Sequence, residues 1–230
     1  MKIFAISDLH LSVNNPKPMD IFGPAWDDYV ENVFADWKEK VSDEDVVLMA
    51  GDFSWAMKLE EAVEDFNLLK DLPGKKIIIR GNHDFWWSSI SAVRKILPKN
   101  FFAIQNDAIK IENSIFCGTR GWILPDENFS VENKKIFDRE VLRLEMTLKK
   151  AQSLRENNEK VYCILHYPPM YYKKDSLFSQ LLEKYNVSKV IYGHLHAKKN
   201  PELFYVKNGI EYFLTSCDLV KHKLVLIDEV

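Results

Sequence analysis

Five short apolar runs in this chain each end at residues of types that commonly bind metal ions. The runs and the residues after them are KIFAI before Asp8-Leu9-His10, VVLMA before Gly51-Asp52, IIIR before Gly81-Asn82-His83-Asp84, VYCIL before His166, and VIY before Gly193-His194-Leu195-His196. Apolar runs of this length are typical of buried strands. Ligands of α/β proteins bind at the carboxyl ends of the strands. We therefore expect these polar side chains to meet at one edge of a sheet.

The rest of the pattern predicts the fold class. Helical spacing of apolar residues covers 25–40, 59–69, 131–157 and 176–185, and a further helix is expected from Ser88 or Ser89 to Ile96. Strands dominate the second half, where Asn208-Gly209 indicates a hairpin. The sequence thus predicts an α/β fold in which two face-to-face mixed β-sheets are flanked by helices. Without a repeat, linker or composition break, residues 1–230 are expected to form a single domain.

Composition narrows the class of protein. A hydrophobic content of 47% with 28% charged residues is typical of a soluble globular protein. The net charge of −3 argues against nucleic acid or a membrane surface as the partner. The first ten residues do not resemble a signal peptide, no run reaches the length of a membrane span, and the three separated cysteines indicate reduced core residues. We expect a cytoplasmic location.

The distribution of histidines indicates a metal centre. Five of the six histidines lie in the five blocks, and His222 is the exception. Imidazoles, carboxylates and an amide oxygen suit Mn, Fe or Zn. Seven candidate ligands exceed what one tetrahedral ion needs, so we expect two divalent ions about 3.5–4 Å apart that share a carboxylate.

In their order along the chain, the five blocks resemble those of the calcineurin-like metallophosphoesterase family, over residues 8 to 196. The resemblance implies that one metal is held by Asp8, His10 and His196. It implies that the other is held by Asn82, His166 and His194, with Asp52 bridging the two.

The resemblance also implies the reaction, which is hydrolysis of a small phosphomonoester or phosphodiester, including nucleotide-like ones, by a metal-bound hydroxide. His83 would face the substrate and protonate the leaving oxygen, since histidine titrates near neutrality. Asp84 would either support the metal ligands or form a turn.

One block departs from the family pattern. The family commonly has GDxxD, whose second aspartate orients the histidine of the GNH block, whereas this chain reads GDFSW with Trp55 at that position. His83 therefore lacks its usual carboxylate partner unless Asp84 replaces it. The proton-donor role and the choice between monoester and diester both depend on this point.

Arg120 and the aromatic residues near the strand ends are secondary candidates. Arg120, in CGTRGW, would serve either as a substrate phosphate clamp or as part of a tight turn. The aromatics (Trp55, Phe85, Trp86, Trp87, Tyr167, Tyr171 and Tyr172) favour core packing over stacking of a nucleobase.

Two other functions are compatible with these blocks. A nuclease or nucleic-acid end-processing enzyme would need a basic groove, of which the net charge gives no sign. A non-enzymatic protein-binding scaffold of this fold would be expected to have lost ligands, and every ligand position is filled. A protein serine/threonine phosphatase is disfavoured because the second block lacks Asp-Arg-Gly. The sequence leaves the substrate, the native metals and the oligomeric state open.

Overall fold

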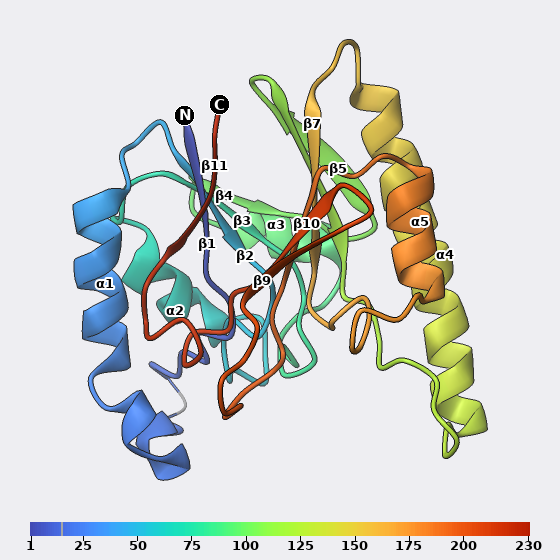
Figure 1. Cartoon of the computed structure of the whole chain (residues 1–230). Coiled ribbons are helices and arrows are strands. Elements are labelled where there is room, and N and C mark those ends of the chain that lie inside the picture. The colour runs from blue at the N-terminus through green and yellow to red at the C-terminus, as the bar shows by residue number, and fades with distance from the viewer. Residues whose placement is uncertain (15) are drawn as a thin grey trace.

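Two β-sheets lie face to face in the computed structural model, which describes residues 1–14 and 16–230 (Figure 1). The first sheet has the order β11-β1-β2-β3-β4, with bounds β1 (Lys2–Ala5), β2 (Val46–Met49), β3 (Lys75–Ile78), β4 (Phe101–Ala103) and β11 (Val225–Glu229). The second has the order β5-β6-β7-β8-β10-β9, with bounds β5 (Asp107–Ile111), β6 (Ser114–Thr119), β7 (Lys160–Leu165), β8 (Lys189–Tyr192), β9 (Phe204–Lys207) and β10 (Ile210–Leu214). Both sheets mix parallel and antiparallel pairs, which confirms the predicted fold class.

Helices cover the outer face of each sheet (Figure 1). Their bounds are η1 (Met19–Phe22), η2 (Pro24–Trp26), α1 (Tyr29–Lys40), α2 (Ala62–Leu69), α3 (Ile90–Ile96), α4 (Val131–Leu154) and α5 (Leu177–Lys184). The first three α-helices pack on the first sheet, and α4 and α5 pack on the second. Among the described residues, no helix combines the length and apolar character that crossing a membrane requires.

Three predicted helices are shorter in the structure than the apolar spacing suggested. The one predicted over 59–69 starts at Ala62. The helix predicted over 25–40 starts at Tyr29, because the Gly23-Pro24 pair begins a separate turn and Asp28 has a left-handed φ of 49°. The helix predicted to reach residue 157 ends at Leu154. Just beyond it, the carboxylate of Glu159 accepts hydrogen bonds from the backbone N–H groups of Glu156 and Asn157 and closes a turn.

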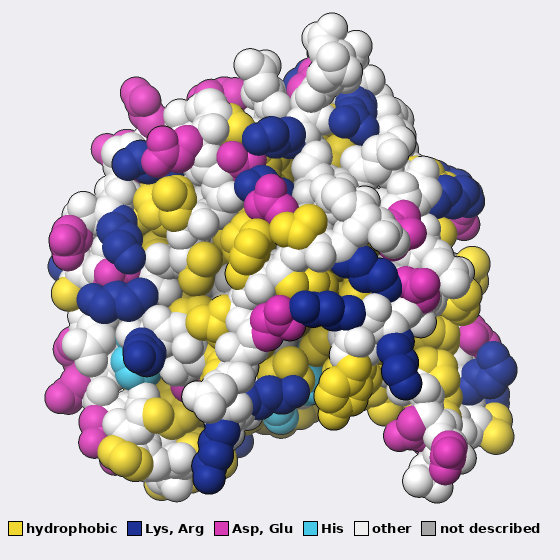
Figure 2. All heavy atoms as spheres, in the orientation of Figure 1, with side chains coloured by type: hydrophobic (Ala, Val, Ile, Leu, Met, Phe, Trp, Pro, Cys, Tyr) yellow, Lys and Arg dark blue, Asp and Glu magenta, His cyan; other side chains and the backbone are white. Residues whose placement is uncertain are grey.

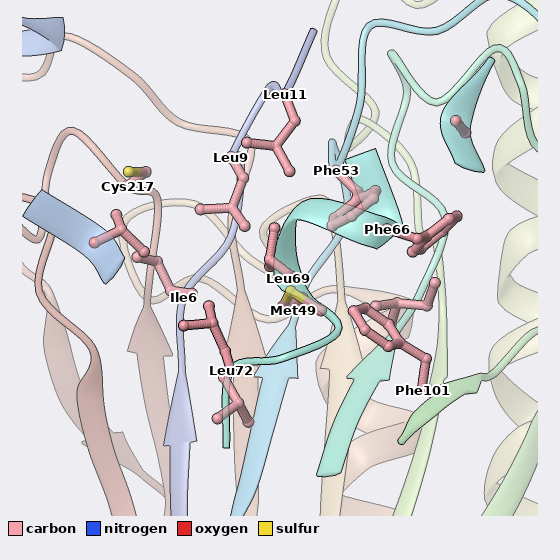
Figure 3. Packing of buried hydrophobic residues seen from close by; sticks show 14 of the residues in the cluster. Ile6, Leu9, Leu11, Met49, Phe53, Phe66, Leu69, Leu72, Phe101 and Cys217 are labelled. Carbon is pink, nitrogen blue, oxygen red and sulfur yellow. The ribbon is translucent and has the colours of Figure 1, made fainter. Parts of the chain in front are cut away.

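The core forms three layers that follow the two-residue period of the strands. In β1, Ile3 and Ala5 face the layer between the sheets, whereas Phe4 packs under the helices. Figure 3 shows that Ile6, Leu9 and Leu11 continue the apolar face beyond the end of β1. Burying each side chain of this size stabilises the fold by about 1.5–3 kcal/mol. The polar residues between them are therefore held at the sheet edge.

The predicted hairpin and the burial of the cysteines are also confirmed. Asn208 and Gly209 join β9 to β10 with φ values of 50° and 80°, the two left-handed residues that a tight hairpin turn requires. Cys117, Cys163 and Cys217 are buried and free.

Candidate metal centre

The ends of five strands bring the predicted residues together at one edge of the two sheets. Parallel pairing of β1, β2 and β3 in one sheet, and of β7 and β8 in the other, places their carboxyl ends side by side. Backbone hydrogen bonds join the segments past these ends, from Asp8 N to Gly51 O at 3.0 Å and from Gly193 N to His166 O at 3.1 Å. The two sheets meet where Ser7 N donates to Thr215 O at 2.9 Å.

Two groups of candidate ligands have their donor atoms within 4.8 Å of one another, namely Asp8, His10 and His196, and Asp8, Asp52 and His166. The first group is the set that the resemblance assigned to one metal. In it, His196 Nε2 lies 3.5 Å from Asp8 Oδ1. The second group contains Asp52 and His166, two residues that the resemblance linked to the other metal.

A single carboxylate oxygen of Asp52 lies near a histidine of each group. Asp52 Oδ2 is 3.9 Å from His10 Nε2 and 3.5 Å from His166 Nε2. The other oxygen, Oδ1, accepts a hydrogen bond of 2.7 Å from the backbone N–H of His83. Asp52 is thus fixed by one oxygen and directs the other toward both histidines.

Two imidazole nitrogens lie next to the side-chain oxygen of Asn82. His166 Nδ1 donates to the carbonyl of Ala50 at 2.9 Å, which leaves its Nε2 as the lone-pair nitrogen. That Nε2 lies 2.6 Å from Asn82 Oδ1, and His194 Nδ1 lies 2.8 Å from the same oxygen. A divalent cation satisfies such a convergence of nitrogen and oxygen lone pairs, so these residues fit the predicted metal.

The backbone at the site adopts sparsely populated conformations. Asp8, His10, Asp52 and His194 have φ values of 58°, 48°, 51° and 71°. A left-handed φ is uncommon for residues other than glycine, and each instance costs on the order of 1 kcal/mol or more. Four such residues in one cluster indicate that the backbone is strained at the predicted metal ligands.

Two glycines permit the close approach of these segments. A Cβ on Gly81 would overlap the Asp52 carboxylate, and a Cβ on Gly193 would overlap the Asp8 carboxylate and the Ser7 hydroxyl. The glycines that precede Asn82 and His194 are therefore explained by packing against the carboxylates.

Burial sets the protonation of the site. It raises the pKa of Asp52 well above its usual value, and the nearby carboxylates of Asp84 and Asp8 raise it further. The opposite holds for Asp8, since the hydrogen bond with His196 and the surrounding imidazoles outweigh burial and keep its pKa well below the usual range. Burial lowers the pKa of His10 and His166 to about 3, so both imidazoles are neutral near pH 7.

Asp218 is a site residue that the sequence analysis missed. Its Oδ1 lies 2.9 Å from His196 Nδ1, and its Oδ2 accepts a hydrogen bond from Ala197 N at 2.9 Å. Although burial alone would lower it, the pKa of His196 is raised to about 10 by Asp218 and Asp8. A carboxylate behind a histidine is a common support in metal sites. Asp218 also follows the end of a strand, β10, and that was the available signal.

The Asp84 carboxylate holds the second and third blocks together. Its Oδ2 accepts hydrogen bonds from Gly81 N at 2.7 Å and Asp52 N at 2.9 Å. Its Oδ1 accepts from Phe53 N at 2.9 Å, Ser54 N at 3.1 Å and Trp86 Nε1 at 3.0 Å. Of the two roles left open, the structure favours support of the ligand loops, and Asp84 does not replace the missing carboxylate partner of His83.

His83 lies against an aromatic ring where the family pattern has a carboxylate. The Trp55 ring lies 4.7 Å from the His83 ring and stacks on His10 at 4.7 Å, with 20° between the latter two planes. Lys17 Nζ lies 3.3 Å from the centre of the Trp55 ring. Burial, followed by the charge of Lys17, lowers the pKa of His83.

A cavity of about 290 Å³ opens beside these residues. Its lining includes candidate ligands and His83 together with apolar side chains from the η1 and η2 region and the second block, namely Met19, Phe22, Trp26 and Trp55. Figure 2 shows histidine and basic side chains next to hydrophobic ones along the lower edge of the molecule. Most of the aromatics named from the sequence are buried, as expected for packing, whereas Phe85 and Tyr172 are exposed.

Arg120 does not line this cavity. Its backbone carbonyl accepts hydrogen bonds from His166 N at 3.0 Å and Tyr167 N at 3.1 Å. Its side chain extends toward α4, where its Nη2 lies 3.8 Å from Glu140 Oε1. Arg120 therefore contributes to a neighbouring pocket.

Comparison with known proteins places the chain in a family. The model of the calcineurin-like phosphoesterases matches residues 1–198, so the protein belongs to the calcineurin-like phosphoesterase family. Membership implies a metal-dependent phosphoric ester hydrolase. No curated protein matches the chain significantly.

Solved structures share the fold at low sequence identity. A protein of unknown function from Aquifex aeolicus is 15% identical, with 98% of this chain and 95% of that chain covered and a TM-score of 0.53. A protein from Thermus thermophilus is 12% identical, with 98% and 97% covered and a TM-score of 0.56. These similarities concern the fold alone.

Proposed function

We propose that residues 1–230 form one catalytic domain that hydrolyses a small phosphomonoester or phosphodiester with two divalent ions. The observation that carries the proposal is the position of Asp52 Oδ2, within 3.9 Å of His10 Nε2 and 3.5 Å of His166 Nε2. Asp8, His10 and His196 would hold one ion, and Asn82, His166 and His194 the other. Asp52 would contact both.

The ions, once bound, would lower the pKa of a water molecule toward neutrality and offset the charge on the phosphoryl oxygens. The protein's own part is to orient the ester. The ring of His83 lines the cavity, and its backbone N–H is fixed on Asp52 Oδ1 at 2.7 Å. In this position the protonated form of His83 would donate a proton to the leaving oxygen. Because burial and the charge of Lys17 lower the pKa of His83, only a minority of the molecules carry that proton near pH 7. The apolar side of the cavity would exclude water from the leaving group.

A small ester fits the dimensions of the site better than a polymer. The cavity has a volume of about 290 Å³, and apolar side chains line it together with the candidate ligands. The net charge of −3 gives no general attraction for a nucleic-acid backbone.

Hydrolysis of chromogenic esters tests the proposal. We expect the protein, once stripped of metal and supplied with Mn²⁺, to cleave p-nitrophenyl phosphate or bis(p-nitrophenyl) phosphate, with activity lost on chelation. His83→Ala should lower kcat by about 10²- to 10³-fold, whereas His222→Ala, outside the five blocks, should keep most of the rate.

Turnover that persists undiminished in chelator would refute the metal-dependent mechanism. A near-native rate in His83→Ala would reject His83 as the proton donor while leaving the metal proposal standing. The ester that is cleaved faster would decide between monoester and diester.

A further inference from the structure

Four arginines and one buried glutamate line a second pocket, of about 220 Å³. Arg80 follows β3, Arg120 follows β6, and Arg139 and Arg143 come from α4, as does the buried Glu140. We call this set the arginine pocket. The charged side chains that line it are four positive arginines and one negative glutamate.

Both carboxylate oxygens of Glu140 already accept a hydrogen bond from a neighbouring side chain. Its Oε1 accepts a hydrogen bond from Arg143 Nη1 at 2.6 Å, and its Oε2 accepts one from the Thr119 hydroxyl at 3.1 Å. Arg120 Nη2 and Arg139 Nε lie 3.8 Å and 3.9 Å from Oε1, beyond hydrogen-bond distance. One carboxylate therefore does not satisfy the guanidinium groups around it.

Arg80 supplies an independent indication. Its Nε is buried and has no hydrogen-bond partner among the described residues. A buried donor without a partner is destabilising by about 1–3 kcal/mol. Nearby, the guanidinium of Arg120 lies over the Trp122 ring at 4.5 Å, an arrangement that keeps its N–H groups free at the edge of the plane.

The arginine pocket is connected to the candidate ligands through the backbone. Arg80 lies two residues before Asn82, a separation of at most about 7 Å between Cα atoms. The carbonyl of Arg120 accepts the hydrogen bond of His166 N at 3.0 Å. An anion in this pocket would thus contact residues whose backbone adjoins Asn82 and His166.

From these contacts we infer that the arginine pocket binds a phosphate or a similar oxyanion, the group that planar guanidiniums recognise through paired N–H donors. Two sources could supply this oxyanion. One, which rests on the proposed function, is a second anionic group of the ester, away from the scissile bond, and the other is a free inorganic anion.

Calorimetric titration of metal-free protein with inorganic pyrophosphate tests the site without any need for turnover. We expect saturable binding that is weakened at least tenfold in Arg139→Gln and in Arg120→Gln. Arg139→Lys should restore part of the affinity, and Arg155→Gln, at the end of α4 away from the pocket, should bind as the native protein does. Thermal melts would establish that the variants are folded. Undetectable binding to native protein, or equal affinity in native protein and both glutamine variants, would overturn the inference.

A kinetic comparison separates the two sources of the anion. With Mn²⁺ present, KM is measured for adenosine 3′,5′-bisphosphate and for adenosine 5′-monophosphate. A KM at least tenfold lower for the bisphosphate, lost in Arg139→Gln, would assign the pocket to the substrate. Equal KM values together with lost pyrophosphate binding would assign it to a free anion.

Discussion

Replacement of Asp84 by alanine is expected to reduce the free energy of unfolding by about 5 kcal/mol or more and to abolish metal binding. The carboxylate is fully buried and accepts five hydrogen bonds, from Gly81 N, Asp52 N, Phe53 N, Ser54 N and Trp86 Nε1. Each donor left without a partner costs about 1–3 kcal/mol. Because two of these donors belong to Gly81 and Asp52, the loops that carry Asn82 and Asp52 would separate.

Urea denaturation of metal-free Asp84→Ala measures this effect, with the exposed Asp71→Ala as the matched control. Asp84→Asn separates the contribution of the negative charge to the free energy of unfolding from that of the shape of the side chain. It keeps one acceptor oxygen, so we expect a loss about half as large as that of alanine. A free energy of unfolding in Asp84→Ala within 1 kcal/mol of the Asp71→Ala value would show that the loops hold without the carboxylate.

Asp52→Asn is expected to stabilise the metal-free protein and to destabilise the metal-bound protein. Three carboxylates, from Asp8, Asp52 and Asp84, are buried close together, and burial with the charges of its two neighbours raises the pKa of Asp52. Removal of one negative charge should therefore raise the melting temperature of the metal-free protein. The same change should remove most of the stabilisation by Mn²⁺, which for a tightly bound ion is about 3–4 kcal/mol, and should lower turnover by about 10³-fold.

Differential scanning calorimetry of both proteins, in chelator and in excess Mn²⁺, gives the four melting temperatures. Asn retains Oδ1 for the hydrogen bond from His83 N, so the loop geometry is preserved. Asp43→Asn, at an exposed acidic residue that does not line the cavity, is the control for charge loss. An equal shift with Mn²⁺ in native protein and in Asp52→Asn would mean that Asp52 is not a ligand.

The strand ends were predictable because local sequence determines them. Each apolar run is long enough to be buried as a strand, and the polar residue after it has no place in the core. After β1, the apolar residues Ile6, Leu9 and Leu11 alternate with polar ones. This alternation already predicts that the apolar side chains enter the core and that Asp8 and His10 stay at the edge of the sheet. Parallel pairing then brings distant blocks together, as the structure confirms for β1, β2 and β3.

The supporting contacts were not predictable, because they join segments that are far apart in sequence. Asp84 meets Phe53 and Ser54 across about thirty residues, and Asp218 meets His196 from the loop after β10. The arginine pocket is assembled from four positions on three segments. Nothing near Arg120 in the sequence indicated that its side chain would extend toward α4 and away from the cavity.

Metal content is the measurement that bears most directly on the two-metal centre. Protein loaded with Mn²⁺, passed through a desalting column and analysed by plasma mass spectrometry should retain about two ions per chain. The Asp52→Asn variant should retain fewer than one. A content near zero in the native protein, or the same content in native protein and variant, would contradict the assembly of these five strand ends into a site for two metals.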